Sequence, residues 1–552
     1  MDPDLASLVE VADHLGVAIS HLSRRIYNQN RDRASTTSPR SLERKFGSWN
    51  EAKRLATLAV APEDPRRAPQ ISFDWDDSAP DTIPDLGPER CDRYVITYAQ
   101  NATPINDDFF ASLLAFCEHR GAKLLVIPGR YKNPTSIWSE KSRSEERWDP
   151  RLDPYLLVTR ESSSNKIISA RRVRLCESLL VASDISIQPT AVRPLTGFEV
   201  FAGQGSCIFG HPKIQLKSIA GSRHGSARTL ASTGAVTVPN YTHSKAGKKA
   251  EAHHVFGALS VEISGDSFSL RQINATSDGS FIDLNEHFSP YGVEEAPRPL
   301  ALIMGDIHVA TVDSTVLDAT LRDGESIAKT LRPEKILYHD TLDFRSRNHH
   351  EIKNPDKVFE RHVRGDGNVD LEVQEAIDFL EATPDFAEPV VVKSNHDAAL
   401  DRWLRDADPK RDPLNAVFYH KARSAKLEHY QDNGEWVSAF ELLYRERGSG
   451  RVTFVSGGYQ IAGIECGFHG DLGTNGARSS ILSYARLGEK TVIGHSHSPA
   501  ILDGCYQVGV TGKLDQGYNK GPSSWQHAHC IIYANGKRSL IFVDRESGKW
   551  RY

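Results

Sequence analysis

The sequence of 552 residues has no uninterrupted run of about 18 apolar residues, so we expect no membrane-spanning helix. Its first segment, MDPDLASLVE, is too acidic and polar for a secretory signal. The seven cysteines are an odd number and form no CxxC pair, which is typical of reduced thiols and disfavours a zinc site built on cysteine. The sequence therefore predicts a cytoplasmic protein.

A global excess of positive charge is also missing. The net charge of −5 gives no overall signature of nucleic-acid binding, although acidic segments can offset a local basic patch. The chain is too long for one hydrophobic core, and its length predicts two to four domains.

The first 60 residues carry a local excess of positive charge. The pattern over residues 5–28 predicts two helices joined by a turn at Gly16, with Ser20 capping the second helix. Residues 14–54 hold nine Lys and Arg against three Asp and Glu. This favours a DNA-binding helix-turn-helix domain over residues 1–60, and a small helical interaction domain is the alternative. The candidate phosphate contacts are Arg24, Arg25, Arg31 and Arg33.

Residues 61–90 have the composition of a linker. The segment 60–90 contains six prolines and eight acidic residues, and its few apolar residues cannot bury enough surface to fold alone. We therefore expect a domain boundary here.

The sequence pattern of residues 91–298 predicts an α/β domain. Two strand-like segments, DRYVITYAQ and AKLLVIPGRY, flank an amphipathic helix at 107–120, and this β-α-β order favours parallel pairing. The segment RYKNPTS follows the second strand, and residues 240–254 (NYTHSKAGKKAEAHH) predict a basic loop that contains glycine. Both segments could contact a DNA backbone, and a solvated basic loop is the alternative. The candidate contacts are Arg130, Lys132, Lys245, Lys248 and Lys249.

The apolar segments of residues 299–552 repeatedly end in Asp, His or Asn. The first, LALIMGDIH at 300–308, predicts a buried strand followed by Asp306 and His308. Open α/β sheets bind ligands at such strand ends, and two side chains that are two residues apart point the same way from an extended backbone. This pair therefore predicts half of a metal site. Asn535-Gly536, between two β-rich segments, predicts a hairpin.

In chain order the strand ends read GDIH, HDTLD, SNHD, FHGD and GHSH. This order resembles the calcineurin-like metallophosphoesterase superfamily, whose pattern is D-x-H, G-D-x-x-D, G-N-H-D/E, H and G-H-x-H. The resemblance implies an αββα sandwich for residues 299–552. Two positions depart from the pattern, because His339 and Ser394 stand where the superfamily has glycine. We expect both to alter the loop backbone and to leave the ligands intact.

The resemblance implies two divalent metal ions, of which Mn²⁺ is favoured over Fe and Zn²⁺. It assigns Asp306, His308 and His497 to the first ion, Asn395, His469 and His495 to the second, and Asp340 as a bridge. A water activated by the ions would attack the phosphorus, and His396 would protonate the leaving group with its ring oriented by Asp397. Arg345 is a candidate phosphate clamp. For any single histidine, a buried structural role is the alternative.

The metal site alone does not choose among phosphoproteins, nucleotides, phospholipids and nucleic acids. The helix-turn-helix-like region and the basic segments favour DNA. From residue 92 onward the chain also resembles early-expressed tailed-phage proteins of host-DNA degradation and DNA transfer, and SbcD-type nucleases share the metal site. These resemblances imply a DNA nuclease that acts in the bacterial cytoplasm, with a homo-oligomer such as a dimer as a possible state. The alternatives are a phosphomonoesterase or nucleotide phosphodiesterase, and a non-catalytic DNA-binding protein on this scaffold.

Overall fold

The computed structural model describes residues 2–15, 19, 24–32, 37–46, 49–59, 91–136, 147–160, 167–203, 205–221, 227–348, 354–517 and 519–552. The chain divides into two compact units, Met1–Thr82 and Ile83–Tyr552. The linker segment expected at 61–90 lies outside the described residues. Among the helices described, none is both long and apolar enough to span a membrane.

The first unit is helical. Its helices are α1 (Pro3–Leu15), α2 (Arg24–Asn30), α3 (Pro39–Phe46) and α4 (Trp49–Leu58). They share a small core that includes Leu8, Ala12, Tyr27 and Leu42. The helical character is therefore confirmed, whereas the turn at Gly16 and the cap at Ser20 lie outside the described residues.

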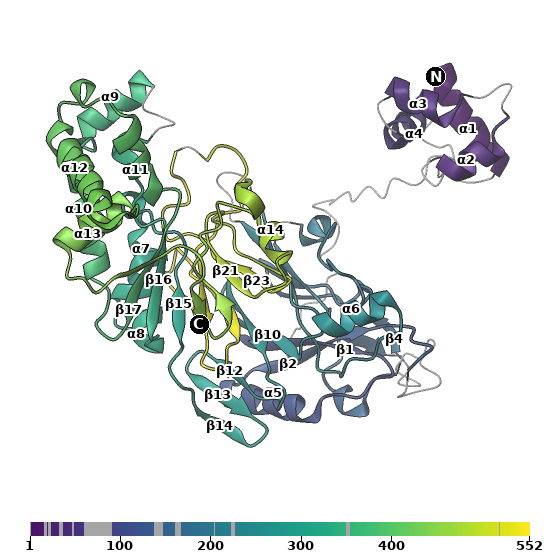
Figure 1. Ribbon diagram of the computed structural model, residues 1–552. Coiled ribbons are helices and arrows are strands. Elements are labelled where there is room, and N and C mark those ends of the chain that lie inside the picture. The colour runs from purple at the N-terminus through teal and green to yellow at the C-terminus, as the bar shows by residue number, and fades with distance from the viewer. Residues whose placement is uncertain are drawn as a thin grey trace. The chain divides into compact units, whose positions relative to one another are not determined.

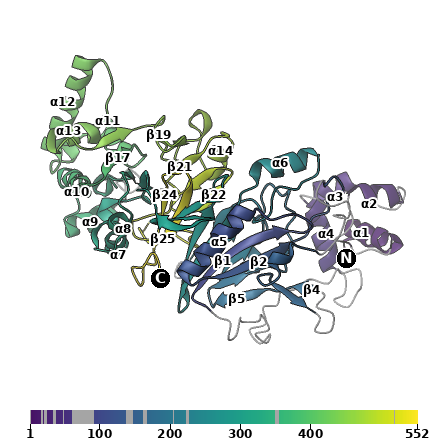
Figure 2. The same ribbon diagram turned by 90° about the horizontal axis from the view of Figure 1, so that it is seen from below.

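The second unit has a mixed α/β fold (Figure 1). Strands β1 (Arg93–Gln100) and β2 (Lys123–Gly129) are parallel and flank α5 (Asp107–Arg120), as the β-α-β pattern predicts. Asn106 caps α5 by accepting a hydrogen bond from the Phe109 main-chain N–H, and Gly121 ends the helix with a φ of 61°. The sheet order is β11 (Ser267–Asn274), β10 (Gly257–Ser264), β1 and β2. Figure 2 shows α5 crossing this sheet.

A six-stranded sheet follows in the order β18-β17-β16-β15-β24-β25. Its strands are β15 (Ala301–Ile303), β16 (Lys335–His339), β17 (Glu388–Val392), β18 (Thr453–Val455), β24 (Ala528–Ile532) and β25 (Arg538–Phe542). The first four are parallel to one another, and β24 and β25 pair antiparallel across the turn at Asn535-Gly536, which confirms the predicted hairpin. Because β15, β16 and β17 are adjacent and parallel, their carboxyl ends meet at one edge.

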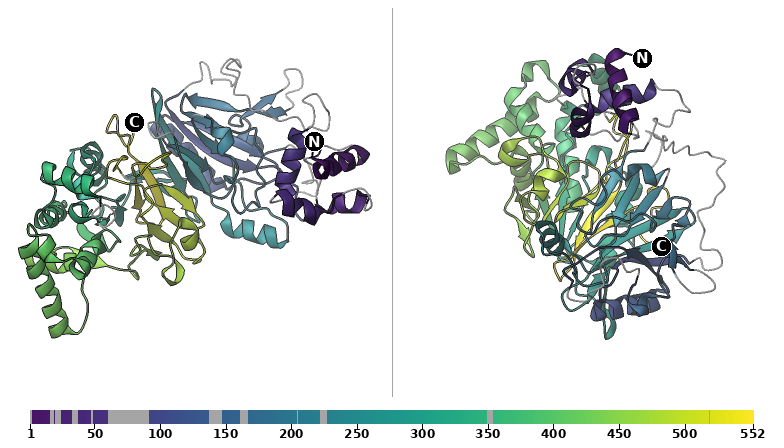
Figure 3. Two further views of the ribbon diagram at one scale, coloured as in Figure 1. Left: turned by 90° about the horizontal axis from the view of Figure 1, so that it is seen from above. Right: turned by 90° about the vertical axis from the view of Figure 1, so that its right-hand side faces the viewer.

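Helices cover one face of this sheet, and Figures 1 and 3 show them grouped beside β15–β17. They are α7 (Ser314–Leu317), α8 (Ile327–Leu331), α9 (Pro355–Arg364), α10 (Val369–Glu381), α11 (Asp397–Asp406), α12 (Ala416–Asn433) and α13 (Ala439–Arg447). Side chains alternate along each strand, so Ile336 and Tyr338 pack against the helical layer while Leu337 packs into the core on the other face.

A ten-stranded sheet contributes to that second core. Its order is β19 (Gln460–Ile461), β20 (Ile464–Glu465), β21 (Thr491–Ile493), β23 (Cys505–Gln507), β22 (Ala500–Leu502), β8 (Leu216–Ile219), β9 (Arg228–Ser232), β7 (Ser206–Phe209), β6 (Leu179–Val181) and β5 (Val173–Cys176). Val492 and Tyr506 from this sheet lie in one core with Leu337. Because β8 pairs with β22, this sheet contains strands from both sides of the domain boundary that we expected between residues 298 and 299. That boundary stays a prediction.

The described part of this unit also contains two smaller sheets and the short helices α6 and α14. The strands are β3 (Val158–Arg160) with β4 (Ile167–Ala170), and β12 (Phe281–Asp283), β13 (Glu286–Ser289) and β14 (Gly292–Glu295). Helix α6 (Lys245–His253) occupies the segment that we expected to be a basic loop, so that expectation was wrong. Helix α14 spans Ile481–Ala485.

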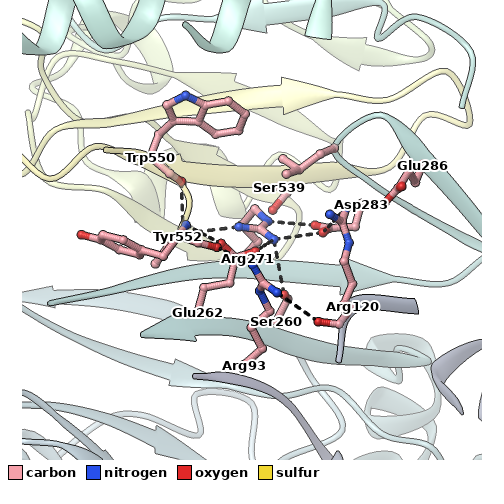
Figure 4. Close-up of polar contacts among 12 residues, drawn as sticks. Arg93, Arg120, Ser260, Glu262, Arg271, Asp283, Glu286, Ser539, Trp550 and Tyr552 are labelled. Carbon is pink, nitrogen blue, oxygen red and sulfur yellow. Dashed lines mark hydrogen bonds and ion pairs between the residues drawn. The ribbon is translucent and has the colours of Figure 1, made fainter. Parts of the chain in front are cut away.

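A buried ionic network ties the β10–β11 hairpin to β12 (Figure 4). The guanidinium of Arg271 is fully buried, 2.6 Å from Glu262 Oε1 and 2.9 Å from Asp283 Oδ1. Glu262 Oε2 also accepts a hydrogen bond from the Tyr552 main-chain N–H at 2.7 Å. Arg120 Nη2 lies farther away, 3.9 Å from Asp283 Oδ2, so removal of the Arg271 cation would leave the buried negative charge largely uncompensated.

Candidate metal centre

The predicted ligands come together where the strands end. Asp306 and His308 follow β15, Asp340 follows β16, and main-chain hydrogen bonds join these ends, with the His308 N–H donating to the Asp340 carbonyl at 2.8 Å. The two later ends are also joined, because the Gly494 N–H donates to the His469 carbonyl at 2.7 Å. Segments distant in the sequence therefore present their side chains where strand ends of the six-stranded and ten-stranded sheets meet.

Four buried side chains form the tightest group, Asp306, His308, Asp340 and His497, with their ligand atoms all within 4.8 Å of one another. His497 Nε2 lies 3.1 Å from Asp306 Oδ2 and 3.0 Å from His308 Nε2. His308 Nε2 is 3.6 Å from Asp340 Oδ2. Two imidazole nitrogens and two carboxylates that converge in this way form a donor set suited to a divalent ion.

Unpaired carboxylate oxygens support the same conclusion. Both oxygens of Asp306 and Oδ1 of Asp340 are buried and accept no hydrogen bond from the described residues. Burying carboxylate oxygens that accept no hydrogen bond is costly, and a bound cation would offset that cost. The residues present therefore fit a metal ion.

The set assigned to a second ion is looser. His469 Nε2 lies 3.3 Å from Asp340 Oδ2, and the ring of His495 packs against that of His469 with centroids 5.2 Å apart. Asn395 Oδ1 is buried and has no hydrogen-bond partner among the described residues. A further group with ligand atoms within 4.8 Å joins Asp306 and His469 to His339.

The backbone at these positions is strained. His308, Asp340, His495 and His497 have φ values of 50°, 48°, 73° and 58°. Residues other than glycine reach this left-handed region at a cost of about 1–2 kcal/mol each, and such residues concentrate at functional sites. Four strained residues in one cluster of charged and imidazole groups therefore indicate a functional site.

A third group contains His396. Asp343 Oδ1 lies 3.2 Å from His308 Nδ1 and 3.4 Å from His396 Nδ1, and the Asp343 carbonyl lies 3.1 Å from the same His396 nitrogen. We expected Asp397 to orient the His396 ring, but its carboxylate accepts hydrogen bonds from the Leu342 N–H and the Ser394 hydroxyl, both at 2.9 Å. Asp343 therefore holds the ring in place of Asp397.

Burial and neighbouring charges shift the pKa values of several residues around Asp340. Burial opposes the charged form of His396, but Asp340 and Asp343 outweigh it and raise the pKa of His396 to about 10. For His469 burial is again outweighed by Asp340, which raises its pKa to about 9. Burial, helped by the nearby Asp340 charge, raises the pKa of Asp397 to about 6, and burial lowers the pKa of His339 to about 4. Acid–base groups with shifted pKa values thus lie around Asp340.

Sequence reasoning missed two members of the site. Asp343 stands in the quoted segment HDTLD, and its spacing from Asp340 was the available signal. His339 was treated only as a backbone change, yet its imidazole is buried beside Asp306 and His469. Its side chain lies on the same face of β16 as Leu337, which the alternation of the strand could have indicated.

Arg345 lies in a short 3₁₀ turn, Arg345–Arg347, and its main-chain N–H donates to Glu372 at 2.5 Å. The side chain is partly exposed and belongs to none of the ligand groups above, so its part as a clamp stays a prediction.

The predicted DNA contacts lie on separate elements. Arg130 and Lys132 follow β2 and are exposed, and Lys245, Lys248 and Lys249 are exposed on α6, where Lys248 pairs with Glu251 at 2.8 Å. In the first unit, Arg31 Nε donates to Asn28 at 3.1 Å. The side chains of Arg24 and Arg25, and Arg33 as a whole, lie outside the described residues. DNA contact by these residues stays a prediction.

Comparison with known proteins gives one informative similarity. The chain is 35% identical over 474 residues to Protein A1 of Escherichia phage T5, covering 83% of this chain and 82% of that protein. No protein-family model matches the chain. No solved structure matches it either. The phage resemblance is therefore confirmed in its coarse form, and the chain belongs to the family of Protein A1 of phage T5.

Proposed function

We propose that this protein is a two-metal phosphodiesterase that acts as a DNA nuclease. The observation that carries the proposal is the buried group of Asp306, His308, Asp340 and His497, in which three carboxylate oxygens accept no hydrogen bond from the described residues and imidazole nitrogens converge. A purely structural cluster would satisfy these groups internally, because buried polar atoms in proteins are almost always hydrogen-bonded.

We further propose that residues 299–552 form a metallophosphoesterase domain of the αββα type. The five sequence blocks occur in the superfamily order, and the parallel strands β15–β18 with their helical cover support this assignment. In this proposal residues 1–60 form the helix-turn-helix-like domain, residues 61–90 the linker and residues 91–298 an α/β domain that contacts DNA.

The proposed ligands divide between the two ions. Asp306, His308 and His497 would hold the first ion, Asn395, His469 and His495 the second, and Asp340 both. Imidazole nitrogens with carboxylate and amide oxygens suit Mn²⁺, Fe or Zn²⁺. When bound, such ions neutralise phosphate charge and lower the pKa of a water molecule.

The protein's own acid–base group is His396. Asp343 engages its Nδ1 atom, which leaves Nε2 to face a substrate, and the ring is 21% exposed and therefore accessible. The carboxylates of Asp340 and Asp343 favour the protonated ring. A protonated imidazole at this position can donate a proton to the leaving oxygen of a phosphodiester, which is a poor leaving group as an alkoxide.

DNA is the proposed substrate because basic side chains are exposed on two other elements, after β2 and on α6. Phosphate contacts of this kind give affinity without sequence preference. The family relation to a phage protein is compatible with such an enzyme in the cytoplasm of a bacterial host.

The test is incubation of the full chain with linear and circular DNA in a panel of divalent metals, with chelator as the blank. His396→Ala and Asp340→Ala should abolish cleavage. The control is His211→Asn, which replaces a buried histidine outside the proposed metal and catalytic residues and should cut DNA as the parent does. Two small substrates sharpen the test. Bis-p-nitrophenyl phosphate has a good leaving group, so His396→Ala should slow its hydrolysis far less than DNA cleavage. Faster turnover of p-nitrophenyl phosphate than of DNA would favour a phosphomonoesterase, and metal-independent DNA binding without turnover would refute the enzyme.

A further inference from the structure

The departure at His339 places an imidazole where the superfamily pattern has no side chain. His339 ends β16 immediately before Asp340, and its ring is completely buried. Its Nδ1 atom lies 3.3 Å from Nδ1 of His469, and the two rings have centroids 5.5 Å apart at an angle of 35°. The contact is therefore edge to edge, in the geometry of a hydrogen bond between ring nitrogens.

The two nitrogens of His469 have different surroundings. Nε2 lies 3.3 Å from the Asp340 carboxylate, on the side of the candidate metal centre, while Nδ1 faces His339. If Nε2 binds an ion, the neutral His469 ring carries its proton on Nδ1. His339 must then accept that hydrogen bond through the lone pair of its own Nδ1.

The space around His339 is adapted to this ring. A Cβ atom on Gly494 would lie 3.2 Å from Cγ of His339 and 2.3 Å from Oδ1 of Asp306. Gly494 is thus required by the close approach of both side chains. The glycine therefore lets this segment pack closely against the His339 ring.

We propose that His339 is a positioning residue that accepts a hydrogen bond from Nδ1 of His469 and so fixes the tautomer and orientation of that ligand. Ligating histidines are commonly held in this way by a carboxylate or a carbonyl, and here a second imidazole takes that part. The proposal rests on the two-ion centre proposed above. It predicts that His339 affects the ion bound by His469 and leaves the ion bound by His308 and His497 largely unchanged.

The test is a titration of the metal-free full chain with Mn²⁺, followed by electron paramagnetic resonance and calorimetry, without any substrate. His339→Ala should weaken one of the two binding steps by about 10–100-fold and leave the other step near that of the parent. His339→Asn should restore much of the lost affinity, because its side-chain oxygen can accept a hydrogen bond near the position of Nδ1. His211→Asn, which removes another buried imidazole, should leave both steps unchanged.

The outcomes separate this role from the proposed function. A parent protein that binds no second ion overturns the two-ion proposal and this role with it. A parent that binds two ions, together with a His339→Ala variant that binds both as tightly, overturns only the role of His339. Equal weakening of both steps, with a matching fall in the unfolding temperature in chelator, also overturns it, because that is the signature of a general structural defect. If His339→Ala does not fold, His339→Asn decides: retention of the second ion supports the role, and its loss refutes it.

Discussion

Substitution of Asp343 by Asn tests how His396 works. The Asp343 carboxylate contacts His308 Nδ1 at 3.2 Å and His396 Nδ1 at 3.4 Å, so one change removes a charged acceptor from two histidines. Hydrogen bonds to charged groups contribute about 1.5–3 kcal/mol, and about 1.4 kcal/mol corresponds to tenfold. We therefore expect kcat on DNA to fall by about 10–100-fold. The affinity for Mn²⁺ at the proposed site that contains His308 should also fall.

The pH profile gives a sharper readout. A general acid is active when protonated, so its contribution is present at low pH and is lost as the pH rises through its pKa. In the metal-free protein the carboxylates of Asp340 and Asp343 raise the pKa of His396, and Asp343 is not among the proposed metal ligands. Removing the Asp343 charge lowers that pKa, so the alkaline limb of the kcat profile should move to lower pH. The assay is steady-state DNA cleavage across pH at saturating Mn²⁺.

Asp397→Asn is the matched control for this experiment. Asp397 is also buried and near Asp340, but its carboxylate accepts from the Leu342 N–H and the Ser394 hydroxyl rather than contacting His396. Its substitution should leave the alkaline limb nearly where the parent has it. If Asp397→Asn moves the limb and Asp343→Asn does not, the assignment of the orienting carboxylate is refuted.

Three further predictions address other parts of the chain. Arg271→Met removes the guanidinium that contacts both buried carboxylates and leaves only Arg120, 3.9 Å from Asp283. It should lower the free energy of unfolding by about 3–5 kcal/mol in denaturant titrations, and a change near zero would contradict the role of the network. The double variant Lys245→Ala and Lys249→Ala should weaken DNA binding. It should also reduce the slope of log affinity against log salt concentration by about one for each phosphate that the protein no longer neutralises. An unchanged slope would exclude α6 from the DNA interface. His495→Gly should relieve the backbone strain at a φ of 73° and so raise the unfolding temperature of the protein in chelator. It should also reduce the stabilisation gained on adding Mn²⁺, because a proposed ligand is lost. A lower unfolding temperature in chelator would contradict strain at this residue.

The strand ends were predictable from the sequence because each couples two strong local signals. A run of apolar residues predicts a buried strand, and a following Asp, His or Asn in the turn has no packing reason to recur. Strands β15, β16, β17 and β21 all precede such residues, as expected. Asp343 and His339 were missed because their importance depends on which face of the backbone they occupy relative to side chains from distant blocks.

Helix α6 shows how glycine misled the interpretation. Gly247 made the segment look like a loop, but Ser244 caps a helix by accepting from the Gly247 N–H at 3.1 Å. The glycine is needed for close approach, because a Cβ atom there would lie 1.8 Å from the Thr242 carbonyl oxygen. Local propensity cannot reveal this kind of requirement. The pairing of β8 with β22 was equally hidden, because it joins segments about 280 residues apart.

The strained backbone bears on how ions would enter the site. Four residues at positive φ represent roughly 4–8 kcal/mol at about 1–2 kcal/mol each, which is comparable to the net stability of a whole domain. Main-chain hydrogen bonds hold these turns, among them the Ile307 N–H to the His339 carbonyl at 2.9 Å and the Thr511 N–H to the Asp306 carbonyl at 2.7 Å. These main-chain hydrogen bonds therefore constrain the turns that carry the ligands. Because the fold already meets the cost of arranging the ligands, a bound ion needs to supply only the charge that the buried carboxylates lack, and its removal should leave the fold in place.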